Sequence, residues 1–200
     1  MRRKSSSFKR RRATRRYKRR YLLVCEGNVT EPEYFRQLMG LYRDSIIDIK
    51  CLKKRQSAPQ YLIDYAIKAQ TDLRKGDELW ILLDLDEWTQ DQFEQLENWS
   101  IQQATCRHVA VSNPCFEIWL VFHEQDPKDC SKNACQSYFL ENIAHGKKGI
   151  RANWLTPSKL GNAVERAKAR DRGSQGIVPN VPTSRVYRLI ENIEGFLSQS

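Results

Sequence analysis

Two short acidic motifs lie where an apolar segment gives way to polar residues. Asp84 and Asp86 close the apolar run ELWILLDLD, and Glu26 follows the run YLLVC and precedes Gly27. Aspartate is a poor strand former, and a buried charge is costly, so carboxylates at these positions call for a specific partner. Two aspartates one residue apart on an ideal strand point to the same side, where their charges repel each other unless a cation lies between them.

A hard divalent cation fits this pattern. Mg²⁺ prefers oxygen ligands and is often held by one or two carboxylates, with water and substrate phosphate completing its shell. We therefore expect Asp84 and Asp86 to bind Mg²⁺, with Mn²⁺ as a substitute. The alternative is that each strand simply ends here and that the acidic side chains face water. Because the pattern occurs on two separate strands, the metal site is the favoured interpretation.

The elements that must position these carboxylates follow from the spacing of apolar residues. Strands alternate with helices, which indicates βαβ units and a mostly parallel four-stranded sheet of the α/β class, flanked by helices. In such sheets, ligands bind beyond the carboxyl ends of the strands, where the crossover connections reverse direction. We therefore expect Glu26 to lie close to Asp84 and Asp86.

The boundaries come from apolar periodicity and from capping residues. Thr30 is expected to cap the first helix, with Glu33 three residues later, and residues 126–154 are expected to form loops. The expected strands are 21–27, 46–52, 78–86 and 108–112. The expected helices begin at Thr30, after Pro59, near Thr89 and at Pro114, with later helices at about 157–169 and from about 183 to Leu197.

Positive charge is concentrated at the amino terminus. Residues 1–20 carry twelve Lys and Arg and no Asp or Glu, whereas the whole chain has a net charge of +10, so the remainder is slightly acidic. A like-charged run of this density is expected to be disordered in isolation. We predict an arm that binds nucleic-acid phosphates without reading sequence; the alternative is a solubilising tail. The residues expected to contact phosphate are Arg10, Arg11, Arg12, Arg15, Arg16, Lys18, Arg19 and Arg20.

Composition excludes several other classes of protein. No apolar run approaches the roughly 18 residues of a membrane span, and no apolar segment follows the basic amino terminus as in a secretory signal. The six cysteines are scattered and form no CxxC pair, so we interpret them as reduced thiols rather than zinc ligands or disulfides. We therefore expect a cytoplasmic protein that does not interact with membranes.

Three segments together carry a family resemblance. They are LLVCEGNVTEPEYF (22–35), ELWILLDLDEW (78–88) and VAVSNPCFEIWLVFH (109–123). In order and spacing they resemble RloB-like proteins, a prokaryotic family that is related to TOPRIM proteins and linked to phage defence. A Glu-Gly pair after the first strand and a DxD motif on a later one also resemble the TOPRIM arrangement of topoisomerases, primases and OLD-family nucleases. The chain departs from the commonest pattern at Glu87 and Trp88, where relatives often carry basic residues or His.

The resemblance implies a fold and a mechanism. It implies a TOPRIM-like (Rossmann-like) core at 21–125, after the arm at 1–20, and a helical extension of the same domain at 126–200. Glu26 would act as general acid and base, and Asp84 and Asp86 would bind Mg²⁺. Glu31 and Glu117 lie in matching motifs and are candidate additional ligands. For both, an ordinary helical position is the alternative, because acidic residues also favour the first turn of a helix.

The function implied is a Mg²⁺-dependent nuclease that cleaves phosphodiester bonds of DNA or RNA. The resemblance further implies an effector of an anti-phage system, with an ATPase partner of AAA or ABC type encoded nearby. One alternative is a phosphohydrolase of the haloacid-dehalogenase kind with Asp84 as nucleophile, although this leaves Glu26 without a role. A second is a catalytically idle subunit that binds nucleic acid or regulates a partner.

Overall fold

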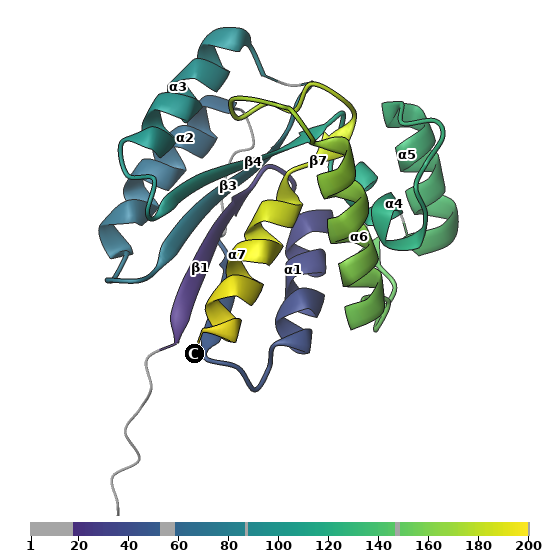
Figure 1. Cartoon of the computed structure of the whole chain (residues 1–200), viewed down its shortest axis with the longest axis horizontal. Coiled ribbons are helices and arrows are strands. Elements are labelled where there is room, and N and C mark those ends of the chain that lie inside the picture. The colour runs from purple at the N-terminus through teal and green to yellow at the C-terminus, as the bar shows by residue number, and fades with distance from the viewer. Residues whose placement is uncertain (1–17, 53–58, 87, 147–148, 200) are drawn as a thin grey trace, which may run out of the picture.

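A computed structural model describes residues 18–52, 59–86, 88–146 and 149–199 (Figure 1). The strands are β1 (Arg19–Cys25), β2 (Ile47–Cys51), β3 (Glu78–Asp84), β4 (Arg107–Asn113), β5 (Ala144–His145), β6 (Gly149–Ile150) and β7 (Thr183–Ser184). The α-helices are α1 (Thr30–Leu41), α2 (Pro59–Ala69), α3 (Gln90–Ile101), α4 (Glu117–Glu124), α5 (Lys132–Tyr138), α6 (Pro157–Arg170) and α7 (Val186–Ser198). A 3₁₀ turn, η1 (Gln70–Asp72), follows α2, and a π-helical segment, η2 (Phe139–Ile143), follows α5. None of these helices is both long enough and apolar enough to span a membrane.

The main sheet has five strands in the order β2-β1-β3-β4-β7. The first four strands of this order pair in parallel, and β7 pairs antiparallel with β4, so the sheet is mixed. The α/β class and the four longer strands agree with the sequence-based prediction, but the prediction of a four-stranded sheet was wrong. Because β7 is only two residues long, it has no periodicity from which it could be predicted.

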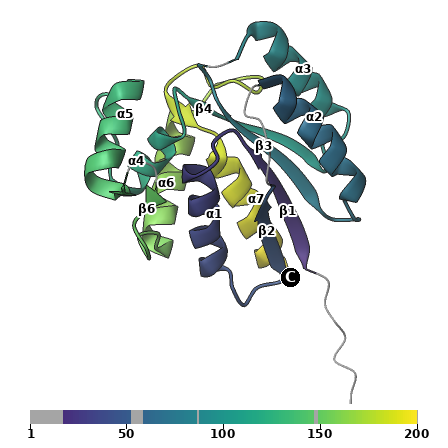
Figure 2. The same ribbon diagram turned by 180° about the vertical axis from the view of Figure 1, so that it is seen from behind.

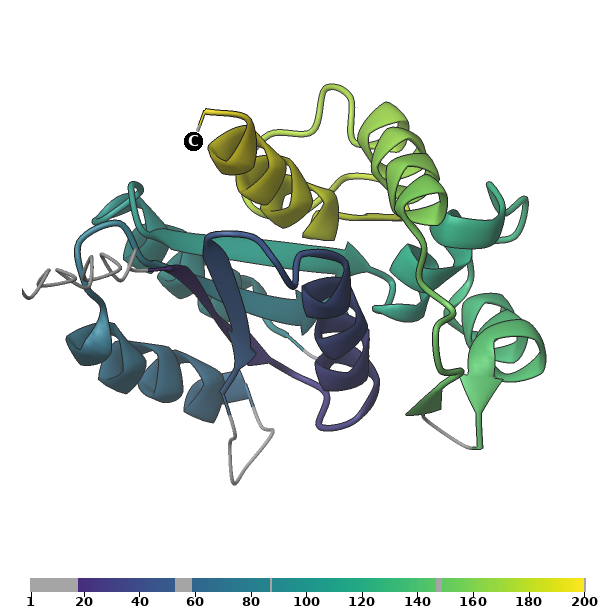
Figure 3. The same cartoon turned by 90° about the horizontal axis from the view of Figure 1, so that it is seen from below.

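Helices cover both faces of this sheet, and side chains of β1 alternate between them. Leu22 and Val24 pack in a core beneath α2 and α3, whereas Tyr21 and Leu23 pack in a core with α1, α4, α6 and α7. Figure 2 shows α1 beside β2, and Figure 3 shows α7 and α2 on opposite sides of the sheet. Both faces are therefore buried, as a largely parallel sheet requires.

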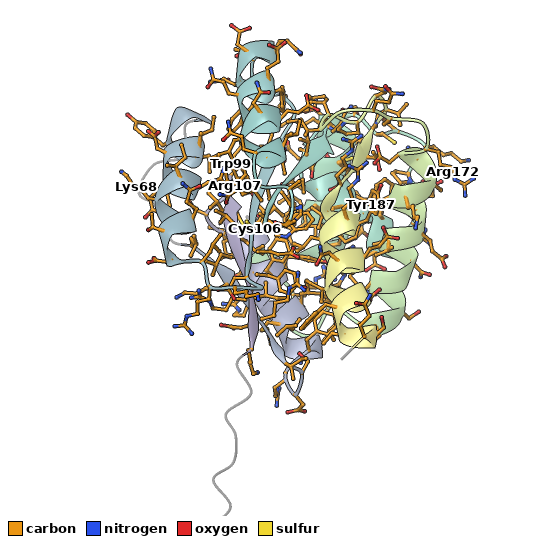
Figure 4. The ribbon with its side chains drawn as sticks, turned by 60° about the vertical axis from the view of Figure 1, so that its left-hand side comes forward. Lys68, Trp99, Cys106, Arg107, Arg172 and Tyr187 are labelled. Carbon is orange, nitrogen blue, oxygen red and sulfur yellow. The ribbon has the colours of Figure 1, made fainter. Side chains whose placement is uncertain are left out.

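Individual labelled side chains make the same division visible. In Figure 4, Trp99 and Arg107 lie together on the α3 side, and Tyr187 lies on α7 at the other side. The guanidinium carbon of Arg107 is 5.3 Å from the centre of the Trp99 ring, and its Nη1 donates to the Trp99 carbonyl oxygen at 3.3 Å. Through this contact, α3 packs against Arg107, the first residue of β4.

The connections reverse direction between β1 and β3. Helix α1 leads from the carboxyl end of β1 to β2 on one face, whereas α3 leads from the carboxyl end of β3 to β4 in the opposite direction and on the other face. The crossovers therefore diverge at the carboxyl ends of β1 and β3. In open α/β sheets, this is where a crevice forms and where ligands bind.

The start of α1 differs from the expectation. Val29, not Thr30, occupies the N-cap position and makes no capping bond with its side chain. The prediction that Glu33 takes part in capping this helix with Thr30 is also wrong. The Glu33 carboxylate instead accepts from the backbone N–H of Ile150 in β6 at 2.7 Å. At α3, by contrast, Thr89 does cap the helix and forms a capping box with Gln92.

The segment expected to form loops contains α5, η2 and the β5–β6 hairpin. Ser131 caps α5 by accepting from the N–H of Ala134. Cys135, Phe139 and Ile143 recur every four residues and are all buried. This spacing is helical, but it is confined to a short, polar segment. The prediction of loops was therefore wrong for α5 and η2.

The boundary of the basic arm also needs correction. Residues 1–17, which include Arg10, Arg11, Arg12, Arg15 and Arg16, lie outside the described residues, as does Glu87. Lys18 is exposed, but Arg19 and Arg20 are the first residues of β1. Arg19 pairs with Glu78, and Arg20 pairs with Asp77, because both acids lie at the amino end of the neighbouring strand β3. These two guanidinium groups therefore hold the amino ends of β1 and β3 together, and their assignment as phosphate contacts stays a prediction.

His123 on α4 is a buried polar group in the larger core. Its Nδ1 lies 2.8 Å from the Trp119 carbonyl oxygen, and its Nε2 lies 3.2 Å from the Tyr34 hydroxyl oxygen. A neutral ring that donates from Nδ1 and accepts at Nε2 satisfies both contacts. Burial, with help from the positive charges of Lys159 and Arg166, lowers the pKa of His123 from 6.5 to about 3.

We predict that the free energy of unfolding decreases as the pH falls from about 6.5 toward about 3, because the unfolded chain takes up a proton at His123 before the folded protein does. This proton alone gives a slope of about 1.4 kcal/mol per pH unit. Urea denaturation at several pH values measures the slope. His123→Gln, which cannot titrate, should show a shallower pH dependence, and identical slopes for both proteins would contradict the prediction.

Candidate active site

A cavity of about 480 Å³ lies at the carboxyl ends of β1 and β3. Its walls come from the loop after β1, from the start of α1, from α4 and from the α5–η2 segment. The carboxylates that line it are Glu26, Glu31, Asp84 and Glu117. The cavity thus occupies the position that the reversal of the connections favours for a ligand.

Glu26 is bound to the neighbouring strand through both its backbone and its side chain. Its backbone N–H donates to the Leu82 carbonyl oxygen at 3.0 Å, which extends the β1–β3 ladder. Its Oε2 accepts from the backbone N–H of Asp84 at 2.9 Å and from Nε1 of Trp88 at 3.1 Å. Two donors from the segment that ends β3 and follows it therefore fix the orientation of this carboxylate.

In the sequence, Trp88 stands out only as a departure from the family pattern. Its side chain is buried against α3, with its ring centre 6.2 Å from that of Phe93. Its indole N–H points back to Glu26. No sequence pattern links positions 26 and 88, so this contact could be found only in the structure.

Glu31 stabilises the turn between β1 and α1. It is only 8% exposed, and its Oε1 accepts from the backbone N–H of Gly27 at 2.5 Å. A Cβ atom at position 27 would overlap the Glu31 carboxylate, so glycine is required there by close approach. The negative charge of Glu31 nevertheless still acts on Asp84.

Asp84 is at the centre of the negative charge. Burial and, to a smaller extent, the charges of Glu26, Glu31, Glu117 and Asp86, in that order, together raise its pKa to about 9. A carboxyl group in these surroundings is protonated at neutral pH unless a cation compensates its charge. Glu117, in the first turn of α4, is the contributor from the opposite wall.

Asp86 does not lie where the alternation of a strand would place it. Strand β3 ends at Asp84, residues 85–86 form a bend and a turn, and Asp86 is not among the residues that line the cavity. Its Oδ2 accepts from Nζ of Lys132 at 2.5 Å. This bond raises the pKa of Lys132, which favours the ammonium form.

Lys132 is the functional candidate that the sequence did not reveal. It is the first residue of α5, within the segment expected to be a loop, and it lines the cavity opposite Asp84. Among the described residues that line the cavity, it is the only cation. The sequence signals for its helix were the Ser131 cap that precedes it and the four-residue spacing of Cys135, Phe139 and Ile143.

The donor chemistry of the cavity suits Mg²⁺, although a complete ligand set is not assembled. Within the described ranges, no group of three or more His, Cys, Asp or Glu side chains is arranged to hold a metal ion. Mg²⁺ needs only one or two protein carboxylates when water and phosphate complete its shell. Asp84, Glu117 and Glu26 are hard oxygen donors around one cavity, and the raised pKa of Asp84 reflects uncompensated negative charge. The residues present therefore fit the ion.

Comparison with known proteins identifies the family. A model of the RloB-like protein family matches residues 21–193. The chain belongs to this family. No curated protein and no solved structure matches the chain.

The matched region places the site within the family. In this RloB-like chain, the match runs from β1 into α7 and includes the cavity carboxylates, Trp88 and Lys132. Residues 1–20, which account for the net positive charge of the chain, lie outside it. The site therefore lies within the region that matches the RloB-like family, and the basic arm lies outside that region.

We predict that Gly27→Ala destabilises the protein and displaces Glu31, because the added methyl group would occupy the space of the Glu31 carboxylate. The cost should exceed about 1 kcal/mol, since a buried carboxylate would lose its backbone donor. Gly161→Ala, in the interior of α6 with nothing within 4 Å of the new Cβ atom, is the matched control. It should stabilise by about 0.5–1 kcal/mol. Thermal denaturation measures both, and a neutral Gly27→Ala would contradict the close approach.

Proposed function

We propose that this RloB-like chain is a Mg²⁺-dependent nuclease that hydrolyses phosphodiester bonds of DNA or RNA. The observation that carries the proposal is the convergence of carboxylates on half-buried Asp84, at the position where the sheet favours ligand binding. A polyanionic substrate can approach such a site only if cations compensate its charge. The proposal assigns the site a TOPRIM-like arrangement, in agreement with the family resemblance.

The residues would hold the ion and the substrate as follows. Asp84 supplies a carboxylate from the end of β3, and Glu117 faces it from the start of α4. Asp86 becomes an additional ligand if Lys132 releases it. When bound, Mg²⁺ neutralises phosphate charge and lowers the pKa of water.

Glu26 is proposed to hold and move the proton. The N–H groups of Asp84 and Trp88 bind its Oε2, so the carboxylate has a fixed direction before substrate arrives. A general base must lie within hydrogen-bonding reach of the proton that it takes, and a fixed orientation reduces the cost of reaching that geometry. Glu31 acts indirectly, by shaping the turn that carries Glu26.

The wider role follows from the family. RloB-like membership and the basic amino terminus support an effector that acts on nucleic acid in an anti-phage system, with an ATPase partner. The arm would increase affinity for phosphates in general, and the cavity would perform the chemistry.

A catalytically idle binding or regulatory subunit is the second candidate. It is favoured by two observations: Asp86 is paired with Lys132, and the described carboxylates are not arranged as a set of three metal ligands. Calorimetric titration with Mg²⁺ separates the two functions, because the idle subunit would bind no ion at this cavity.

We predict that Asp84→Asn combined with Asp86→Asn loses Mg²⁺ binding and cleavage together, because neutral amides compensate a divalent cation poorly. Glu26→Gln should retain much of the Mg²⁺ affinity but lose cleavage by roughly 10²–10⁴-fold, the usual loss for a general acid or base. Asp91→Asn, at an exposed position in α3, is the control. Cleavage is assayed with the full chain and its proposed ATPase partner. If the complex still cleaves at the full rate when both Asn substitutions are present, the proposal that this chain is a metal-dependent nuclease is wrong.

A second prediction concerns Trp88. Trp88→Phe keeps an aromatic ring against Phe93 but removes the N–H that binds Glu26, so kcat should fall by about 10–100-fold, since bonds to charged groups contribute roughly 1.5–3 kcal/mol. The pH dependence of kcat should also shift, while Mg²⁺ affinity should not change. Trp99→Phe is the matched control, because the Trp99 indole N–H has no hydrogen-bond partner. Trp88→His can supply a ring N–H and should restore part of the activity; equal effects at positions 88 and 99 would contradict a positioning role.

A further inference from the structure

The α5–η2 wall, residues 132–143, gives the cavity a second chemical character. It contributes Lys132, Gln136, Phe139 and Leu140, which recur at helical spacing and therefore share one face. Segment η2 is a π-helix, a rare conformation that is frequent at functional sites. The carboxylates lie on other elements, namely the β1–α1 segment, β3 and α4. One side of the cavity thus provides carboxylates, whereas the α5–η2 wall provides a lysine, an amide and apolar side chains.

The cationic end of this wall is Lys132. Its side chain is 38% exposed, and that of its partner Asp86 is 36% exposed. A pair this exposed contributes little to stability, so the ammonium group can exchange Asp86 for another anion at small cost. Because the described lining is otherwise rich in carboxylates, Lys132 is the position where a phosphate oxygen would be bound.

The other end of the wall is apolar and exposed. Leu140 is 51% exposed, and Val29, from the loop across the cavity, is 40% exposed. Single exposed apolar side chains are common, but these two line the same acidic cavity. Gln136 lies between the two ends and carries both a donor and an acceptor. The wall therefore presents a cation, an amide and an apolar surface in order.

The dimensions of this arrangement fit one nucleotide unit. Eight residues separate Lys132 from Leu140, which corresponds to about 12 Å along a helix. A volume of about 480 Å³ is within the range of small-ligand sites and far too small for a duplex. A base inside a duplex is stacked on both faces, whereas an unpaired base can turn its faces and edges toward protein side chains.

We propose that the α5–η2 wall recognises an unpaired nucleotide of a nucleic-acid strand, with its phosphate on Lys132 and its base against Leu140 and Val29. This inference rests on the proposed function, because it specifies the substrate of the same cavity. It deepens that function by selecting single-stranded or unpaired segments over duplex. Gln136 would contact an edge of the base.

The test measures binding without metal, so that it does not depend on cleavage. The full chain is titrated in EDTA with fluorescently labelled single-stranded DNA, single-stranded RNA of the same sequence, and the corresponding DNA duplex. Lys132→Ala is compared with Lys128→Ala, which removes an exposed lysine four residues earlier that does not line the cavity. Both variants keep the basic arm, so its general affinity cancels in the comparison.

We expect Lys132→Ala to weaken binding of the single strands by about 5–10-fold relative to Lys128→Ala and to reduce the salt slope by about 0.7, the value of one phosphate contact. The duplex should bind equally to both variants. Leu140→Ser should weaken the single strands without changing the salt slope. Which single strand shows the larger effect distinguishes an RNA from a DNA substrate.

Asp86→Asn should change the affinity for the single strand in the direction opposite to Lys132→Ala. It frees Lys132 from its partner and should strengthen metal-free binding of the single strand, and this gain should largely vanish in the Lys132→Ala background. The inference would be overturned if Lys132→Ala and Lys128→Ala bound the single strands equally well. It would also be overturned if Lys132→Ala weakened duplex binding as much as single-strand binding. If the inference fails while cleavage remains Mg²⁺-dependent, the nuclease still stands. If selective binding is seen without any cleavage, the nuclease fails and the recognition site stands.

Discussion

The concentration of negative charge around the half-buried carboxyl group of Asp84 is the constraint on which the rest of the site depends. Burial, together with the charges of four other acidic side chains from three different segments, raises its pKa to about 9. The fold tolerates this arrangement because three of these neighbours have a compensating contact. Glu26 accepts from the Asp84 backbone and Trp88, Glu31 accepts from Gly27, and Asp86 accepts from Lys132. A cation that bound here would relieve the remaining repulsion, and this is why the metal-dependent function is favoured.

Much of this framework could be predicted from the sequence, because burial on both faces of a parallel sheet leaves long apolar runs. The strands that carry Glu26 and Asp84 were predicted for this reason, and the rule that parallel strands end at one edge brought the two residues together. The rule did not extend to Asp86. Alternation along a strand holds only while the strand continues, and β3 ends two residues earlier.

The contacts that orient the carboxylates could not be predicted in the same way. Trp88 and Glu26 are 62 residues apart in the chain, and no periodicity relates them. Lys132 belongs to a seven-residue helix whose buried positions are few, and short helices derive their stability from tertiary packing rather than from local propensity. Apolar periodicity therefore located the acidic half of the cavity, whereas the α5–η2 wall depends on packing against α4.

The two ends of β1 separate the two modes of nucleic-acid binding that are proposed for the chain. Arg19 and Arg20 pair with Glu78 and Asp77 at the amino end of the sheet, and this fixes where the basic segment joins the fold. The cavity begins beyond Cys25, at the other end of a seven-residue strand, or about 23 Å away. General phosphate affinity at one end and a single-nucleotide cavity at the other would thus act on different parts of the same polymer. Affinity would then change with salt without changing which nucleotide the cavity accepts, since only the cavity contacts the base.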